Sequence, residues 1–530
     1  MNFSTRRIFP LLPAFAVLLV FLVYLKTLLP GVGYSGDTSK FQFVGKVLGT
    51  PHEPGSPGYV VLNYLFVTLV PIGTAGFKAN LLSAILAAAA LFVVSKTLIL
   101  LGVRETLAAA TVLIFGFTYT LWSQAVIAEV YALCVLFVAL TIHFYLRWHL
   151  FGLYRDFIIA CAVYAFSFGD HLIVVTLLPA IVYFTWTTRK EYIWTPRIVV
   201  QVLGVILLGA AQYGYLFWRY YAHETSYLEI AVPDLKTLWY YVSGGQFHSY
   251  FFVAGIRGFF FLNSPMILRL LWLEFVILLP VSLAGFLAVR NSRIRIFLLL
   301  CAAGPLFFTL SYSVGDVFVY LLPVYVVLAI ALGAALEWIF ARTPAQLLRA
   351  AGVVVAALPV FFLFINYGRA DQSHNTKSRE LVEESLRIVG RKALIICPDY
   401  DVAEHFWYYL FAERTGDDSL YALFSHEEDL PVGKLKSYVE EGQPFFLPVQ
   451  RCETPPGLTV YYCTAYEPPS FDVNRTRNPK SRGMLNEYRR SFVYAPMQRL
   501  TQLGLRFERV GTALYRVEKS ETSGKVSAQK

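Results

Sequence analysis

Charge is scarce in this sequence. Only 15% of its 530 residues are Asp, Glu, Lys or Arg, whereas 57% are hydrophobic. Soluble domains carry roughly 25% charged residues, so the composition excludes a wholly soluble protein. It predicts a chain surrounded mainly by lipid, and the aromatic content of 16% is typical of a protein with aromatic belts at both membrane interfaces.

Several chemical motifs are also absent. The sequence has no P-loop, GxSxG, HExxH or Rossmann glycine fingerprint, which disfavours nucleotide-driven transport by this chain. None of its six cysteines forms a C-x-x-C pair, so no zinc ribbon or redox motif is expected, although Cys452 and Cys463 are candidates for a disulfide. The net charge of +10 does not indicate a nucleic-acid partner, because Lys and Arg accumulate in cytoplasmic loops of membrane proteins.

Apolar runs predict a polytopic helical bundle of about eleven spans. A span needs about 20 mostly apolar residues. The run at 11–30 is expected to be a retained signal-anchor helix, with a cleaved signal peptide as the alternative. The other predicted spans are 80–100, 105–122, 130–147, 157–168, 171–187, 198–219, 265–289, 296–313, 317–340 and 350–366. The apolar run 59–72 is short and stops at Pro71, so the segment 59–79 is predicted to lie in the interface instead.

The basic residues predict the orientation. If 59–72 does not cross, every cytoplasmic loop is basic, whereas the opposite turns 123–129, 168–170 and 313–316 contain no Lys or Arg. The positive-inside rule then places the N-terminus in the cytoplasm and the chain after residue 367 outside it. We therefore expect a multi-pass protein of a bacterial inner (cell) membrane, in contact with membrane lipids.

The composition also predicts three regions. Residues 1–369 form a transmembrane domain with a first outer loop at 31–58 and a second long outer loop at 220–264. Residues 370–517 are predicted to form an extracytoplasmic α/β domain, because ALIICPDYD is typical of a buried strand and GLRFERVGTALYRVEK of a hairpin. The polar tail 518–530 is predicted to be disordered.

The first outer loop carries the leading candidate residues. Asp37 is either a general base for an acceptor hydroxyl or the N-cap of a helix that starts at Thr38. His52 is a candidate hydrogen-bond donor to a phosphate, or it bonds only within its own loop. Lys46 is a second phosphate candidate, although an exposed loop lysine is commonly just solvated.

Other candidates lie on the same predicted face. Glu129 starts a span in an otherwise apolar segment, where an ionisable residue is costly and therefore a functional candidate. Further substrate-positioning or phosphate candidates are Asp170, His171, Asp316, Gln246 and His248. The aromatic stretch around 235–250 is expected either to contact substrate or to anchor its loop in the interface. No ligand spacing indicates a metal, so no cofactor is assigned and a divalent metal stays open.

A series of spaced motifs carries a family resemblance. In order they are GDTSKF, HEPGSPGY, FKANLLSAI, LWSQAVIAEVYAL, FGDHL, YYVSGGQF, SYSVGD and YLLPVY. Over about residues 10–370 the sequence resembles the membrane part of the endoplasmic-reticulum protein O-mannosyltransferases that modify IPT domains, together with bacterial homologues once classed as a domain of unknown function. That family is similar to the GT-C glycosyltransferases.

The resemblance implies a function. GT-C enzymes transfer a sugar, with inversion, from a polyprenyl-phosphate donor, and they use an acid in the first outer loop, which falls on Asp37. The family's second-loop acid falls on Glu129, and its H-x-P-G-x-P element begins at His52. The expected activity is transfer of a single sugar, with mannose as one candidate, to a hydroxyl of a protein or glycolipid acceptor. The alternatives are a transporter or flippase of a lipid-linked substrate and a non-catalytic membrane scaffold.

Overall fold

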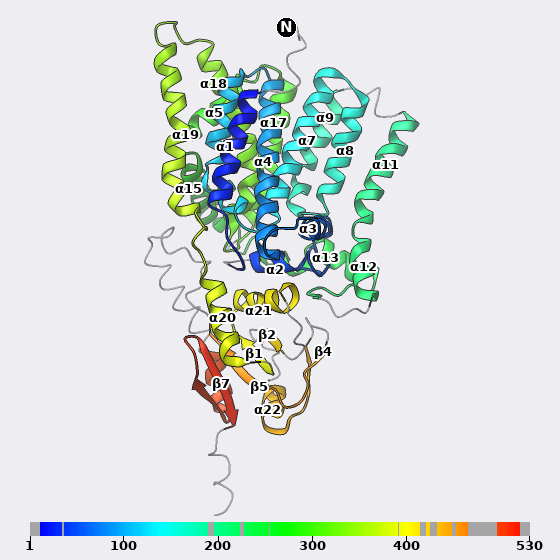
Figure 1. The fold of residues 1–530 in the computed structure, drawn as a ribbon. Coiled ribbons are helices and arrows are strands. Elements are labelled where there is room, and N and C mark those ends of the chain that lie inside the picture. Colours follow the sequence, from blue (N-terminus) through cyan, green and yellow to red (C-terminus); the bar gives the residue numbers. More distant parts are fainter. Residues whose placement is uncertain are drawn as a thin grey trace, which may run out of the picture.

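The computed structural model describes residues 11–33, 37–188, 195–222, 227–253, 255–390, 392–413, 420–424, 432–447, 452–464 and 495–519. The chain folds into a tall bundle of helices and a smaller domain that contains a sheet (Figure 1). The smaller domain lies at one end of the bundle, below helices that run across that end.

The bundle contains the predicted apolar helices. They are α1 (Leu11–Lys26), α4 (Ala75–Leu100), α5 (Glu105–Gly116), α6 (Tyr119–Ala125), α7 (Tyr131–Phe151), α8 (Tyr154–Ser167), η1 (Leu172–Leu177), α9 (Leu178–Thr188), α11 (Pro196–Ala211), α12 (Gly214–Tyr221), α15 (Ser264–Phe275), α16 (Leu278–Ala288), α17 (Ser292–Ser311), η4 (Val317–Leu321), α18 (Leu322–Phe340) and α19 (Leu348–Ala370). Many of their side chains, such as Leu203 and Phe364, are apolar and exposed, as expected for surfaces that face lipid. The protein is therefore an integral membrane protein.

The predicted helical membrane bundle is confirmed, whereas the number of spans is approximate. In the described part of the chain, seven helical segments are long and apolar enough to cross a membrane, or eight if α5 and α6 form one span. The count falls below eleven where helices are short or broken. The axis bends by 70° between α5 and α6, and the predicted span 265–289 is interrupted at Val276, whose φ is 49°.

Short elements cross the end of the bundle that faces the C-terminal domain. They are α2 (Thr38–Phe43), α3 (Pro57–Leu69) and α13 (Leu235–Val242). The short η2 (Gly245–Tyr250) follows α13, whereas α14 (Gly255–Gly258) and η3 (Phe259–Asn263) continue into α15 as one apolar helical segment, 255–275. Figure 1 shows α3 nearly end-on beside the upright α4. The apolar run 59–72 thus lies across the bundle instead of along it.

Buried polar side chains hold α2 against the bundle. Gln42 accepts a hydrogen bond from the amide of Gly33 (2.9 Å) and donates to Asn80 of α4 (3.0 Å). Asn63 of α3 donates to the carbonyl of Phe41 (2.6 Å). Since these groups are buried, each bond is costly to lose, and together they fix the short helix that carries the candidate residues.

The C-terminal domain is built on a five-stranded sheet of order β2-β1-β5-β7-β6. β1 is parallel to β2 and β5, and β7 is antiparallel to β5 and β6, so the predicted terminal hairpin is present. The strands are β1 (Ala393–Cys397), β2 (Leu420–Phe424), β5 (Thr459–Cys463), β6 (Leu505–Arg509) and β7 (Leu514–Lys519), with a small ribbon of β3 (Phe446–Leu447) and β4 (Cys452–Glu453). The helices are α20 (Lys377–Val389), α21 (Tyr400–Ala412), α22 (Val432–Glu441) and α24 (Ala495–Gln502).

The structure decides one point that the sequence left open, the disulfide, and corrects one expectation, the start of the tail. Cys452 and Cys463 both carry reduced thiols, so no disulfide joins them. Strand β7 continues to Lys519, two residues into the predicted tail 518–530, because Glu518 and Lys519 pair with β6. Residues 520–530 lie outside the described residues.

Candidate functional site

Asp37 occupies the N-cap position of α2 but does not cap the helix with its side chain. Only its backbone carbonyl accepts a hydrogen bond from a helix amide, that of Phe41 (2.9 Å). The carboxylate instead contacts the ammonium of Lys40, one turn along α2, at 2.7 Å. The Asp37 side chain is 36% exposed, so a molecule outside the protein can reach it. Of the two interpretations of Asp37, the structure excludes the side-chain cap.

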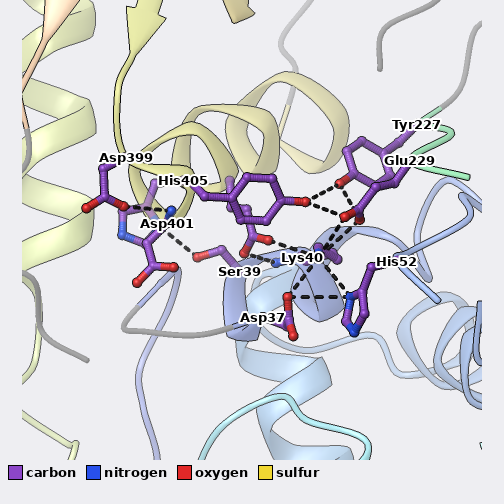
Figure 2. Close-up of polar contacts among 11 residues, drawn as sticks. Asp37, Ser39, Lys40, His52, Tyr227, Glu229, Asp399, Asp401 and His405 are labelled. Carbon is purple, nitrogen blue, oxygen red and sulfur yellow. Dashed lines mark hydrogen bonds and ion pairs between the residues drawn. The ribbon is translucent and has the colours of Figure 1, made fainter. Parts of the chain in front are cut away.

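Lys40 is the centre of the site (Figure 2). Its side chain is 1% exposed, yet its Nζ lies 2.7 Å from Asp37, 3.0 Å from Glu229 and 3.3 Å from Glu404. It also lies 3.0 Å from Nδ1 of His52. An ammonium has three protons to donate, and its hydrogen bonds to Asp37, His52 and Glu229 use all three, while Glu404 adds an ion pair.

Glu229 reaches Lys40 from the second outer loop. The backbone of this loop pairs with Thr50, whose amide donates to the carbonyl of Tyr227 and whose carbonyl accepts from the amide of Glu229, each at 2.9 Å. The hydroxyl of Tyr227 donates to Glu229 (2.9 Å), and so does that of Tyr400 from α21 (2.6 Å). Both oxygens of Glu229 are therefore held in place beside Lys40.

Helix α21 brings the C-terminal domain into the same cluster. Glu404 is fully buried, and its Oε2 accepts a hydrogen bond from the backbone amide of Lys40 (3.2 Å). The next residue, His405, lies 2.7 Å from the hydroxyl of Ser39. The ring of Tyr400 lies under Nζ of Lys40, 4.9 Å from it. Figure 2 shows His405 of α21 beside Ser39 of α2.

The charges around Lys40 determine the ionisation of the carboxylates. Burial opposes ionisation of Asp37, but His52 and the Lys40 ammonium outweigh it and lower the pKa of Asp37 to about 2. Asp37 therefore stays ionised at any physiological pH. Burial raises the pKa of Glu404 well above its usual value, although Lys40 opposes that rise. Burial also lowers the pKa of His52, and Lys40 acts in the same direction.

The contact with Lys40 fixes the tautomer of neutral His52. Because an ammonium only donates, Nδ1 of His52 must accept the bond, and the ring proton then resides on Nε2. The ring packs between Phe41 and Phe247, with centroid distances of 6.3 and 6.1 Å. The contacts with Lys40, Phe41 and Phe247 thus fix the His52 ring and leave its Nε2–H for another acceptor, as expected for a phosphate-binding candidate.

A second group of predicted residues lies near Asp37. The negative charge of Asp37 acts on both Glu129 and Asp316. Burial, together with this charge, raises the pKa of Glu129 well above its usual value and that of Asp316 to about 6. The Tyr131 hydroxyl donates to Asp316 (3.4 Å), and the Tyr131 ring contacts the His171 ring at 5.4 Å. The structure thus brings Asp37, His52, Glu129, His171 and Asp316 to one end of the bundle.

Asp170 lies behind the loop that contains His52. Its carbonyl accepts a bond from Ser56 (2.7 Å), while its carboxylate is fully buried. Burial raises the pKa of Asp170 well above its usual value. Asp170 therefore supports the loop, and the structure does not bring its side chain to Lys40.

Gln246 and His248 are arranged differently from each other. The backbone amide of Gln246 donates to Glu53 (3.0 Å), which fastens η2 to the loop beside His52. His248 instead bonds to the carbonyl of Ser243 in its own segment (3.0 Å). The structure gives the Gln246 side chain no role at Lys40.

Lys46 lies apart from the cluster. It is exposed and forms no ion pair with a described residue, so it is a solvated loop lysine. Within the described ranges, no group of three or more His, Cys, Asp or Glu side chains is arranged to hold a metal ion.

Sequence reasoning missed the residues that surround the site. Lys40 belongs to the first outer loop, but its pairing with Asp37 was readable only as an i, i+3 spacing on an expected helix. Glu229, Tyr400 and Glu404 carried no signal, because Glu404 and Lys40 are 364 positions apart.

The arrangement of helices defines a structural class. The chain is similar to the crystal structure of ArnT from Cupriavidus metallidurans bound to undecaprenyl phosphate, with a TM-score of 0.57 over 95% of this chain and 97% of ArnT, at 12% identity. The apo state of ArnT gives the same TM-score at 13% identity. At these identities the likeness shows the fold, and that fold is the one of GT-C glycosyltransferases.

Sequence comparison points to particular relatives. Residues 37–194 match the family model of the N-terminal domain of protein O-mannosyl-transferase TMEM260, which confirms the expected family resemblance. The chain is 28% identical to the mouse protein O-mannosyl-transferase TMEM260 over 206 residues, 38% of this chain and 29% of the mouse protein. Its counterpart from Dictyostelium discoideum is 22% identical over 212 residues, 37% of this chain and 26% of that protein. The chain thus matches less than a third of the length of these relatives.

Proposed function

We propose that the protein is an inverting glycosyltransferase. It transfers a single sugar, with mannose as the first candidate, from a polyprenyl-phosphate donor to a hydroxyl acceptor at the outer membrane face. A protein Ser or Thr is the acceptor that the TMEM260 match favours. The donor class is supported by the fold shared with ArnT, whose structure contains undecaprenyl phosphate.

One observation carries the proposal. Asp37, the first residue of the family match, is an accessible, ionised carboxylate whose position is fixed by a buried lysine. Because it is ionised and exposed, this carboxylate is open to the proton of a hydroxyl that approaches from solvent, and it takes that proton as the hydroxyl oxygen bonds to the sugar. The basic-residue pattern supports the outer face, because the site lies at the end of the bundle that carries the C-terminal domain.

The reaction can be written with the residues in place. The acceptor oxygen forms a bond to the anomeric carbon while its proton passes to Asp37. The bond from that carbon to the phosphate oxygen breaks, and the phosphate leaves with its lipid. Nε2–H of His52 donates a hydrogen bond to the leaving phosphate. Lys40 does not perform this task, because its three protons are already used by Asp37, His52 and Glu229.

The purified protein with a polyprenyl-phosphate mannose and a Ser- or Thr-containing peptide tests the proposal. Loss of a general base typically costs roughly 10²- to 10⁴-fold, so we expect Asp37→Asn to lose transfer by that factor. Asp371→Asn is the matched control, because among the described residues the Asp371 carboxylate bonds only within its own turn, to Ser373. The same transfer rate in Asp37→Asn and wild type would eliminate Asp37 as the base. No transfer by wild type from any polyprenyl-phosphate sugar would favour the transporter or scaffold alternatives.

A further inference from the structure

We propose that Glu404, in α21 of the C-terminal domain, is a positioning residue for the transfer site, which it completes by holding Lys40 against Asp37 and His52. The inference rests on the proposed function and adds a role for a domain that lies outside the family match at 37–194. Glu404 is not itself a group that touches substrate, because its side chain is 0% exposed.

Glu404 restrains Lys40 at two points. Its Oε1 is 3.3 Å from Nζ of Lys40, and its Oε2 accepts from the backbone amide of the same residue at 3.2 Å. One carboxylate therefore restrains both the backbone of Lys40 and the ammonium at the tip of its long, flexible side chain. The contact between His405 and Ser39 fixes the neighbouring residue of α2.

Docking of the domain does not require this carboxylate. The ring of Phe411 in α21 stacks on Phe43 of α2 at 5.6 Å, and the Tyr408 hydroxyl accepts a bond from the amide of Gly76 (3.0 Å). Burying an ion pair costs desolvation, and apolar residues of similar size often stabilise an interface as well or better. Since these other contacts already dock the domain, the buried Glu–Lys pair points to control of Lys40 and not to adhesion.

Lys40 needs restraint from the side opposite Asp37. Asp37 is 36% exposed and Glu229 is 20% exposed, so both face water on one side. Glu404 is the buried member of the three carboxylates. Without it, we expect the ammonium to move toward the exposed side, which would change its contacts with Asp37 and His52, the two groups that act on the substrate.

The full-length enzyme tests this with Glu404→Gln and Glu404→Ala. Glu413→Gln is the matched control, since Glu413 follows α21 and accepts a bond from Tyr408 (2.6 Å) without contacting Lys40. Hydrogen bonds to charged groups carry enough energy that we expect kcat to fall about 10- to 100-fold in Glu404→Gln. The KM for the polyprenyl-phosphate sugar should stay within about twofold, because Glu404 does not bind the donor. The control should match wild type.

Amide hydrogen exchange provides a readout that does not depend on activity. In Glu404→Ala, the peptide containing Lys40 should exchange faster than in wild type, while peptides of α21 keep their protection. In Glu413→Gln, the Lys40 peptide should be unchanged.

The outcomes separate the two proposals. Unchanged kcat in both Glu404 variants would overturn the positioning role, and so would a fall in kcat accompanied by lost protection throughout α21, which is the signature of undocking. If wild type transfers no sugar, the proposed function fails. The hydrogen-exchange measurement still decides whether Glu404 holds Lys40. If the peptide containing Lys40 exchanges at the wild-type rate in Glu404→Ala, the positioning role of Glu404 is overturned.

Discussion

Replacing Lys40 with methionine tests the electrostatic design of the site most directly. Methionine keeps much of the length of the side chain and removes only the ammonium. Three carboxylates then face one another around an uncharged residue, and Glu404 among them has no exposure to water. We expect Lys40→Met to destabilise the protein strongly, as well as abolish transfer.

The contact distances give the size of the stability loss expected in Lys40→Met. With an effective dielectric constant of about 20, each charge pair at about 3 Å contributes roughly 5 kcal/mol of gross attraction. Much of that attraction is offset by desolvation, and breaking a buried pair by removing one partner typically costs about 3–5 kcal/mol. Since Asp37 and Glu229 are partly solvated, most of this cost comes from Glu404. Lys46→Met is the matched control, and its exposed side chain should contribute within about 0.5 kcal/mol.

The loss should depend on pH in a defined direction. Burial already raises the pKa of Glu404 in the folded protein above its usual value of 4.5, and removal of Lys40 raises it further. A carboxyl whose folded pKa is raised favours the folded state below its unfolded pKa, and this contribution is lost as the pH rises through the folded pKa. Lys40→Met should therefore lose more stability at about pH 8 than at about pH 5.

Thermal unfolding in detergent, followed by intrinsic tryptophan fluorescence, measures both effects. The reasoning is refuted if Lys40→Met and Lys46→Met have the same melting temperature at both pH values. It is also refuted if the stability lost in Lys40→Met is larger at the lower pH. The double variant Lys40→Met, Glu404→Gln should recover part of the lost stability, because the uncompensated charge is then absent.

Two further substitutions test the packing of the bundle. A Cβ on Gly285 in α16 would collide with the carbonyl oxygen of Ala331 in α18, so Gly285→Ala should lower the free energy of unfolding by about 1–3 kcal/mol. Gly352 in α19 has open space around it, so Gly352→Ala is the control and should not lower stability. The same melting measurement decides, and equal melting of the two variants would contradict the close helix contact. Arg104→Ala removes an ion pair with Glu337, and the Arg104 side chain is 45% exposed, so the free energy of unfolding should fall by no more than about 1 kcal/mol. A larger fall, measured by chemical unfolding, would contradict the view that this pair is a solvated surface contact.

The bundle and the location of the site were predictable because lipid imposes simple rules on sequence. Long apolar runs predict helices, and the basic loops assign alternate turns to opposite faces. That alternation assigns Asp37, Glu129 and Asp316 to one face, and in the structure the charge of Asp37 acts on the other two. The break at Val276, where φ is 49°, was not predictable, because the position carries neither Pro nor Gly.

The surroundings of Lys40 were beyond sequence reasoning for a different reason. The two lysines of the first outer loop have the same chemistry, and only tertiary contacts separate buried Lys40 from exposed Lys46. Glu229 and Glu404 follow Lys40 by 189 and 364 positions, so no local pattern links them. Long-range ion pairs of this kind depend on how two domains dock, which hydrophobic periodicity does not specify.

The charge balance at Lys40 restricts how a phosphate donor can be bound. One ammonium faces the carboxyl groups of Asp37, Glu229 and Glu404, so the cluster has no excess positive charge, and the Lys40 protons already go to Asp37, His52 and Glu229. An anionic donor gains little from such a centre by charge alone. Hydrogen bonding by a neutral group does not depend on that charge, and His52, with Nδ1 already engaged by Lys40, retains Nε2–H for that purpose. The lysine therefore serves the reaction indirectly: it keeps the base ionised and orients the imidazole that meets the phosphate.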